Sequence, residues 1–179
     1  MRIAQIAPLY EAVPPVAYGG TERVIVALCD GLVELGRDVT LFVSEMSSTR
    51  ARLEPMVAAP LRTRMTEAEL RDLGPRLHTR LLAEIYERAD EFDVIHSHLD
   101  VLTLEFTRQT QVPSVLTLHG RLDIDVVDTM LSRYPEVPLV SISDHQRICR
   151  ARDAREGHAH ILGVRLNRDA CIDADRSGL

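Results

Sequence analysis

The sequence predicts an α/β fold with a doubly wound parallel sheet, on two observations. Five short runs rich in β-branched and aliphatic residues recur along the chain, at residues 2–7, 38–44, 93–98, 114–120 and 138–143. Nearly continuous apolar runs of this length are typical of strands that are buried on both faces. Segments with helical periodicity separate several of these runs, and a β-α-β order with right-handed crossovers builds a parallel, Rossmann-like sheet.

The first predicted helix lies between the first two strands. Aliphatic residues recur at helical spacing over residues 24–35. Thr21 stands directly before them and can cap the start of the helix, whereas Gly36 can end it in the left-handed conformation. We expect this helix to pack on the sheet.

A second helical segment begins with a capping box, and it contains a Gly-Pro pair. The letters TEAE at residues 66–69 place a threonine three residues before a glutamate, which is the pattern of two reciprocal end caps. Because proline lacks an N–H group and crowds the preceding turn, we expect the helix to break at Gly74-Pro75 and to resume over residues 76–92. Shorter helices are expected after Asp100 and Asp123.

Composition excludes several classes of protein. The chain has 179 residues, of which 45% are hydrophobic, and this predicts one globular domain with a real core. All basic residues other than histidine are arginines, and the net charge of -6 gives no general attraction to nucleic acid. No apolar run approaches the length of a membrane span and no secretory leader is visible, so we expect a cytoplasmic protein. Three scattered cysteines, Cys29, Cys149 and Cys171, indicate neither a disulfide framework nor a zinc site.

Polar residues gather where the predicted strands end. His96 and His98 close the third strand, His119 and Gly120 close the fourth, and Ser143 closes the fifth. Ligands of open α/β sheets bind beyond the carboxyl ends of the strands, so these groups are expected at one edge. His119 followed by Gly120 is the best candidate for function, because glycine allows close approach of a ligand to the backbone.

Two adjacent glycines precede the first helix. Gly19 and Gly20 can expose backbone N–H groups at the positive end of the helix dipole, where a phosphate would bind. They can equally serve a tight turn from the loop into the helix. The spacing matches neither the dinucleotide-binding fingerprint nor a P-loop.

Four ordered motifs resemble a known family. The segments beginning YGGTERVIVALCDGL, FDVIHSHLD, VPSVLTLHG and PLVSISD are similar to the amino-terminal domain of family 4 retaining glycosyltransferases, which have the two-domain GT-B fold. The resemblance runs from Met1 to about Arg147 and implies a Rossmann-like, acceptor-side domain over residues 1–147. It also implies transfer of a sugar from a nucleotide-diphosphate donor to an acceptor hydroxyl with retention, without a metal or other cofactor.

The resemblance assigns roles to residues of this chain. His119 is expected near the anomeric carbon, as the catalytic candidate, and the glycine loop is expected to approach the donor's diphosphate and sugar. The remaining candidates for substrate binding are Gly19, Gly20, Thr21, Glu22, His98, Gly120, Ser141 and Ser143. Each has a structural alternative. His96 is expected only to hydrogen-bond neighbouring loops, Glu22 can complement the helix dipole, and Asp123 and Asp125 are expected to cap the next helix.

Two other functions remain open on the residues alone. His96, His98 and His119 can furnish three nitrogen ligands for a metal-dependent hydrolase, with Asp100, Asp123 or Asp125 as a carboxylate ligand. A sugar-binding module without turnover would retain the same crevice.

The last segment departs from the family. Residues 148–179 are rich in Arg, Ala and His, and they suggest either a frameshifted tail or a segment that docks on a partner. A family enzyme needs a second, donor-binding domain, so we expect a truncated chain that is inactive alone and binds nucleotide sugars poorly. A separate chain could supply the other half, and a homodimer through the exposed strand edge is also expected.

Overall fold

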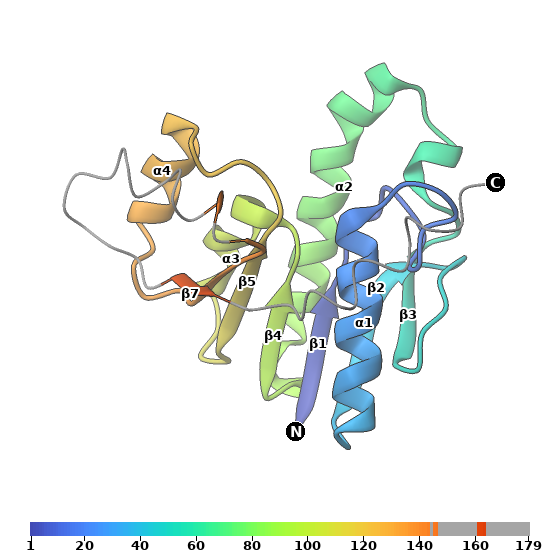
Figure 1. Ribbon diagram of the computed structural model, residues 1–179, viewed down its shortest axis with the longest axis horizontal. Coiled ribbons are helices and arrows are strands. Elements are labelled where there is room, and N and C mark those ends of the chain that lie inside the picture. Colours follow the sequence, from blue (N-terminus) through green and yellow to red (C-terminus); the bar gives the residue numbers. More distant parts are fainter. Residues whose placement is uncertain (144, 147–160, 164–179) are drawn as a thin grey trace.

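The computed structural model describes residues 1–143, 145–146 and 161–163, and within them one sheet of seven parallel strands (Figure 1). The strands are β1 (Arg2–Ile6), β2 (Asp38–Ser44), β3 (Arg52–Val57), β4 (Val94–Ser97), β5 (Ser114–Leu118), β6 (Leu139–Ser141) and β7 (Ile161–Gly163). Their order is β3-β2-β1-β4-β5-β6-β7, so the topological switch point lies between β1 and β4. The predicted parallel α/β fold is confirmed.

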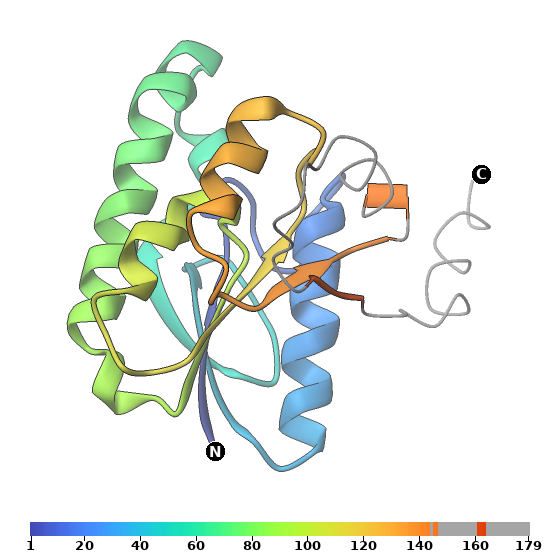
Figure 2. The same ribbon diagram turned by 90° about the vertical axis from the view of Figure 1, so that its left-hand side faces the viewer.

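Helices cover both faces of the sheet (Figure 2). Helix α1 (Gly20–Glu34) packs Ile25 and Cys29 against β2 on one face. On the other face, α2 (Glu67–Glu87) covers β1, β2 and β4, while α3 (Leu104–Thr107) and α4 (Asp125–Ser132) cover β5 and β6. The sheet is therefore doubly wound, with apolar clusters on each side.

The ends of α1 differ in how well they were predicted. Thr21 does not cap the helix, because α1 begins one residue earlier and its N-cap is Gly19, which forms no side-chain capping bond. The backbone carbonyl of Gly19 instead accepts the N–H of Arg23 at 3.2 Å. Gly36 does adopt a positive φ of 71°, as expected for a left-handed helix end.

Helix α2 keeps its predicted start and lacks the predicted break. Thr66 and Glu69 form both bonds of the capping box. The helix then continues through Pro75 to Glu87. Apolar residues before and after the proline pack on the sheet, and we attribute the unbroken helix to this burial, which offsets the cost of about 3 kcal/mol for an interior proline.

The same helix holds the loop between β1 and α1. Its buried His78 accepts the N–H of Leu9 at its Nε2 atom, at 2.8 Å, and its Nδ1 lies 2.7 Å from the carbonyl of Gly74. The ring of Tyr10 packs on His78 at 4.7 Å, and a Cβ atom at Gly74 would lie only 2.8 Å from the Tyr10 hydroxyl. A larger residue at position 74 would collide with the loop, which lies against the helix at that turn.

Two strands escaped prediction. β3 is an edge strand that is half exposed and contains Pro55, so it lacks both continuous apolar character and strict alternation. β7 has three residues and pairs with β6.

Asp123 and Asp125 do not cap α4, contrary to the prediction. The N-cap of α4 is Ile124, and it forms no side-chain capping bond. Apart from β7, the divergent segment 148–179 lies outside the described residues.

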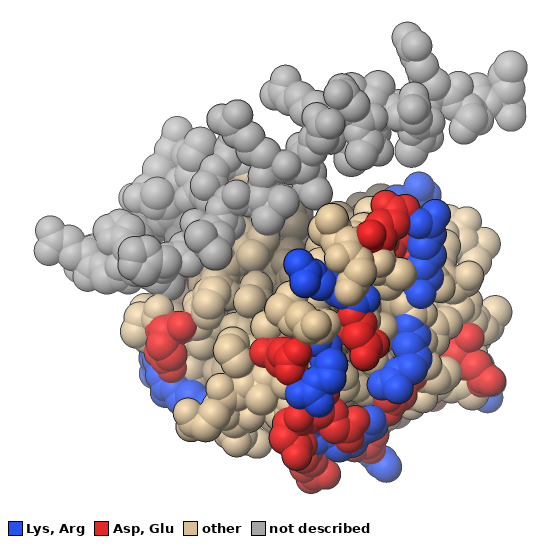
Figure 3. Space-filling model, turned by 90° about the horizontal axis from the view of Figure 1, so that it is seen from below, with Lys and Arg blue, Asp and Glu red and all other residues tan. Residues whose placement is uncertain are grey.

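On the face that Figure 3 shows, basic and acidic side chains are interleaved rather than segregated. Near the amino ends of the strands, Arg2 pairs with Asp93, and Arg88 pairs with Glu54 and Glu91. Figure 3 shows arginines beside acidic residues on this side. None of the described helices combines the length and the hydrophobicity that a membrane span needs. Burial raises the pKa of the Cys29 thiol to about 12, so this cysteine is unreactive.

His78 is expected to contribute strongly to stability. Replacing it with leucine leaves the N–H of Leu9 without its acceptor in a buried site, which costs about 1–3 kcal/mol. Urea denaturation measures this loss. The control is Thr79→Val at the next position, where the exposed hydroxyl bonds only the Pro75 carbonyl and the change is expected to stay within about 0.5 kcal/mol. Equal effects of the two substitutions would contradict the role given to His78.

Candidate functional site

The candidate site lies at the carboxyl edge of β1, β4 and β5. The strand order places β1 beside β4 and β4 beside β5, with Gln5 directly opposite His96. Side chains two residues apart on a strand share a face. Gln5, His96, His98, Thr117 and His119 therefore come together on the α1 side of the switch point.

Hydrogen bonds join these five side chains in one chain. His119 Nε2 lies 2.9 Å from His98 Nδ1, and His98 Nε2 lies 3.1 Å from Gln5 Oε1. Gln5 Nε2 then lies 3.2 Å from His96 Nδ1, and His96 Nε2 lies 2.8 Å from Thr117 Oγ1. The rings also pack together, with centroid distances of 4.5 Å between His96 and His98 and 5.2 Å between His98 and His119. We call this set the histidine chain.

The histidine chain is uncharged. Burial lowers the pKa of His96 and of His119 to about 4, and the neighbouring His119 lowers that of His96 further. His98 is 2% exposed, and burial together with the two other histidines lowers its pKa well below the usual range. Because a buried imidazolium is disfavoured without a charge partner, all three rings are neutral at pH 7.

The turn at His119-Gly120 is held from two sides. Asp100 accepts the N–H of His119 at 2.7 Å and also bonds the N–H of Gly120. Gln146 donates to the carbonyls of Leu118 and Gly120, at 2.9 and 2.6 Å. A Cβ atom at Gly120 would lie 3.3 Å from the Asp100 carboxylate, so glycine also allows the two segments to meet.

Sequence reasoning missed these supporting residues. Asp100 was predicted only as a possible metal ligand and as the residue before a short helix, and no role was predicted for Gln5, Thr117 or Gln146. Asp100 has a φ of 46°, unusual for a residue other than glycine, and this conformation aims its carboxylate at the neighbouring turn. The one signal for Gln5 in the sequence was a glutamine inside an otherwise apolar predicted strand.

The two glycines before α1 have different surroundings. A Cβ atom at Gly19 would lie 2.6 Å from Pro15 Cβ and 2.7 Å from Glu22 Oε2, so Gly19 serves close packing of the loop. At Gly20 a Cβ atom would meet no described atom within 4 Å. The start of α1 is therefore open beside Gly20. Glu22, in the first turn, is buried, and this burial raises its pKa.

The other predicted residues are distributed around this edge. Thr21 is partly buried in the first turn of α1. His96 bonds strand residues rather than loops. Ser143 is exposed and accepts the N–H of Gln146 at 3.1 Å. Ser141 pairs with Leu118 on the opposite face from the histidine chain, and its buried hydroxyl has no hydrogen-bond partner among the described residues.

A metal site is not supported by this arrangement. Both ring nitrogens of His96 and of His98 are already engaged in hydrogen bonds, so neither offers a free lone pair. Among the described residues no group of three or more His, Cys, Asp or Glu side chains is placed to hold a metal ion. Asp100 bonds backbone N–H groups, and Asp123 pairs with Arg121.

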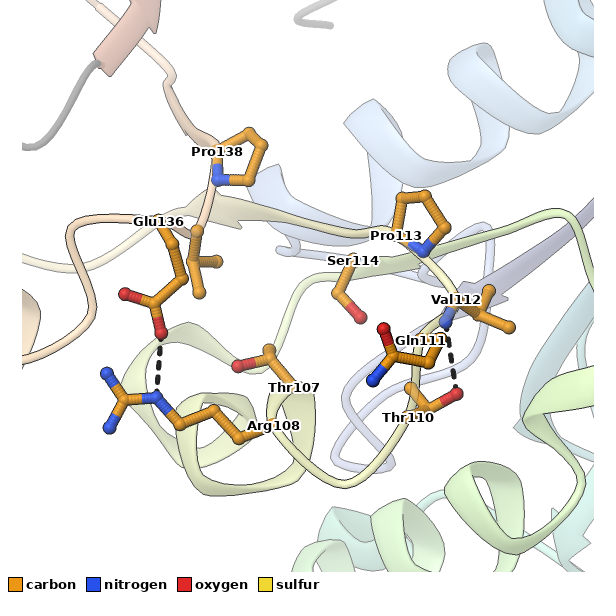
Figure 4. A pocket seen from close by; sticks show the side chains of 10 residues that line it. Thr107, Arg108, Thr110, Gln111, Val112, Pro113, Ser114, Glu136 and Pro138 are labelled. Carbon is orange, nitrogen blue, oxygen red and sulfur yellow. Dashed lines mark hydrogen bonds and ion pairs between the residues drawn. The ribbon is translucent and has the colours of Figure 1, made fainter.

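A separate pocket of about 300 Å³ lies near the amino ends of β5 and β6 (Figure 4). Arg108 at its rim bonds Glu136 at 2.7 Å and the carbonyl of Arg133 at 2.6 Å, and its guanidinium stacks on Tyr134. Its charged groups are therefore already paired. Ligands of open α/β sheets bind at the other edge, so this pocket is not the candidate site.

Comparison with known proteins assigns the family. Residues 18–160 match the family described as Glycosyltransferase Family 4. The chain belongs to Glycosyltransferase Family 4. This family 4 domain includes the α1 start and the turn at His119-Gly120. No curated protein sequence matches the chain.

Two solved structures share the fold of this family 4 domain. One is AviGT4, a glycosyltransferase involved in avilamycin A biosynthesis, with 20% sequence identity and a TM-score of 0.51 over 84% of this chain. The other is a sucrose-phosphate synthase from Thermosynechococcus elongatus, with 14% identity and a TM-score of 0.63 over 91% of this chain. The match covers 38% and 47% of those two chains. The family 4 domain thus spans less than half the length of either one.

The neutral histidines predict a pH-dependent stability. The unfolded chain binds protons at these histidines near pH 6.5, whereas the folded chain resists them to about pH 4 at His96 and His119. The free energy of unfolding is therefore highest above pH 6.5 and decreases as the pH falls toward 4. At pH 5, each of these two histidines lowers the free energy of unfolding by about 2 kcal/mol.

Urea denaturation at pH 7.5 and pH 5 measures this dependence. His119→Gln removes one of the titrating groups, so the difference between the two pH values should be smaller in that variant. A free energy of unfolding that is the same at both pH values would contradict a neutral, buried histidine chain.

The two glycines provide a matched pair of substitutions. Gly19→Ala is expected to destabilise the protein by about 1–3 kcal/mol, because the added methyl group overlaps Pro15. Gly20→Ala is expected to leave stability unchanged or raised by up to about 1 kcal/mol. Thermal melts compare the two variants. The reverse order of stabilities would contradict the described loop.

Proposed function

We propose that this domain is the acceptor-side half of a retaining glycosyltransferase with the two-domain GT-B architecture. The complete enzyme would transfer a sugar from a nucleotide-diphosphate donor to an acceptor hydroxyl. The observation that carries the proposal is the position of His119, at the carboxyl end of β5 in a family 4 domain, with its turn fixed by Asp100 and Gln146. Such fixation is the preorganisation that transfer chemistry requires.

In this proposal, His119 would bind the transferred sugar and the backbone at Gly20 would bind the diphosphate. His119, neutral because burial lowers its pKa to about 4, would hydrogen-bond the transferred sugar near the anomeric carbon rather than donate a proton as an imidazolium. The open backbone at Gly20, at the positive end of α1, would approach the diphosphate. We propose that Thr21, Glu22 and Gly120 also contact the substrates, and that Ser143 would meet substrate from the β6 end.

The chemical step would exchange one bond at the anomeric carbon for another. The bond to the diphosphate oxygen would break and the diphosphate would leave with the electron pair. The acceptor oxygen would bond the anomeric carbon on the same face and pass its proton to the departing diphosphate oxygen. Backbone N–H groups at the start of α1 would stabilise the charge that develops on the diphosphate.

A second domain would complete the site. The domain spans 38% and 47% of the two solved chains that share its fold, which is consistent with one half of a two-domain enzyme. We propose that the donor's nucleotide binds mainly to that other half, whether it is part of a longer chain or a separate one. The 179-residue chain alone would then bind nucleotide sugars poorly and show no turnover.

Transfer by an assembled enzyme tests the proposal. The chain is joined to the donor-binding half of a family 4 glycosyltransferase and assayed with UDP-, GDP- and ADP-sugars. His119→Ala is expected to lower kcat/KM at least a hundredfold, about 2.7 kcal/mol of transition-state stabilisation, while the melting temperature changes by only a few degrees.

Gln109→Ala serves as the control for that assay. The side chain of Gln109 is exposed and bonds only the Glu105 carbonyl, outside the carboxyl edge, so its replacement should leave transfer unchanged. Full activity of the His119 variant would refute the proposed site. Sugar binding without any turnover in the assembled protein would instead indicate a sugar-binding module.

A further inference from the structure

The side chain of Gln5 sets the direction of the hydrogen bonds in the histidine chain. It is completely buried in β1, and its amide lies between two imidazoles. An imidazole nitrogen can donate or accept according to its tautomer, whereas the oxygen of an amide only accepts and its nitrogen only donates. The amide therefore decides which nitrogen of each ring carries hydrogen.

Between Gln5 and His119, each hydrogen bond fixes which ring nitrogen carries the hydrogen. Gln5 Oε1 accepts, so His98 Nε2 carries the hydrogen at the 3.1 Å contact. A neutral imidazole has one N–H, which makes His98 Nδ1 an acceptor. His119 must then donate from Nε2 across the 2.9 Å contact, and its Nδ1 is left with a free lone pair.

Between Gln5 and Thr117, the same reasoning places the hydrogen of His96. Gln5 Nε2 donates to His96 Nδ1 at 3.2 Å, so the hydrogen of His96 lies on Nε2. That hydrogen is donated to Thr117 Oγ1 at 2.8 Å. All three histidines thus take the Nε2–H form, and every bond of the chain has one donor and one acceptor.

We infer that Gln5 and His98 are positioning residues that hold His119 in the Nε2–H tautomer, so that its Nδ1 is a hydrogen-bond acceptor for the substrate. The group opposite Nδ1 must then be a donor, and the matching substrate group is a neutral sugar hydroxyl. A carboxylate or phosphate oxygen would meet lone pair against lone pair there. The tautomer assignment does not depend on the proposed function. Only the statement that the hydrogen-bond donor opposite Nδ1 belongs to a sugar rests on that function.

The surroundings of His119 agree with this direction. Among the described residues, Nδ1 of His119 has no hydrogen-bond partner, and the single buried side-chain polar atom without a partner is Ser141 Oγ. The Nδ1 atom is therefore accessible. Burial of the three rings keeps them neutral, which preserves one N–H in each.

Histidine NMR spectra of the full 179-residue chain at pH 7 test the inference directly. In long-range ¹⁵N–¹H spectra, protonated and bare ring nitrogens resonate in separate regions, and couplings to the ring protons identify each nitrogen. His96, His98 and His119 are expected to show Nε2–H. His78 is the internal control, because it accepts from Leu9 at Nε2 and is expected to show Nδ1–H.

Substitutions at Gln5 add a second readout. Gln5→Glu removes the donor toward His96, so His96 should gain a proton on Nδ1 while His98 and His119 keep theirs on Nε2. Gln5→Met removes both contacts, so His98 and His119 should show mixed tautomers. The signals of His78 should not change in either variant. If a variant does not fold, the spectrum of the unsubstituted chain still decides.

The opposite orientation of the Gln5 amide would reverse every bond in the chain. His119 would then carry its hydrogen on Nδ1 and would donate to the substrate. Observation of Nδ1–H at His119 in the unsubstituted chain overturns the inference. Full transfer by His119→Ala in the assembled enzyme would instead remove the proposed function and leave the tautomer assignment in place.

Discussion

The carboxyl edge of this domain depends on the burial of one polar side chain. Gln5 lies in the interior strand β1 without exposure, where an unpaired amide would cost several kcal/mol. Its two bonds to His98 and His96 remove that cost. The bond in which Gln5 donates to His96 Nδ1 requires the His96 ring to be neutral, because an imidazolium has no accepting nitrogen. The same bonds connect β1 to β4, and through Thr117 and His119 to β5. The central three strands are thereby fixed together at the edge where ligands of such folds bind.

The segments around that edge are held by polar contacts of the same kind. Asp100 and Gln146 bond backbone groups of the His119-Gly120 turn, and His78 bonds the backbone at Leu9 in the loop before α1. Each uses a side chain from one element to satisfy the backbone of another. Loops built in this way lose little freedom when a ligand binds, which suits the role proposed for this edge in orienting two substrates.

Sequence alone predicted the sheet well and the site in part. β2 reads as a continuous apolar run because it is buried on both faces, whereas β3 was missed because an exposed edge containing Pro55 lacks that pattern. The break at Gly74-Pro75 was wrongly predicted, since packing of α2 on the sheet outweighs the local preference of proline. His119 was selected as a candidate through the glycine beside it, and its role stays a prediction. Its connection to Gln5 through His98 was not predictable, because the residues His98 and Gln5 are 93 positions apart and only the fold brings them together.

A crystal structure of the assembled enzyme with an intact nucleotide sugar and an unreactive acceptor is the most direct test of the central claim. We expect a sugar hydroxyl within hydrogen-bond distance of His119 Nδ1 and the diphosphate beside the backbone of Gly20. It also predicts that the bonds from His119 through His98 to Gln5 are unchanged by binding. A sugar bound away from His119, or a histidine chain rearranged to place Nε2 against the ligand, would contradict it.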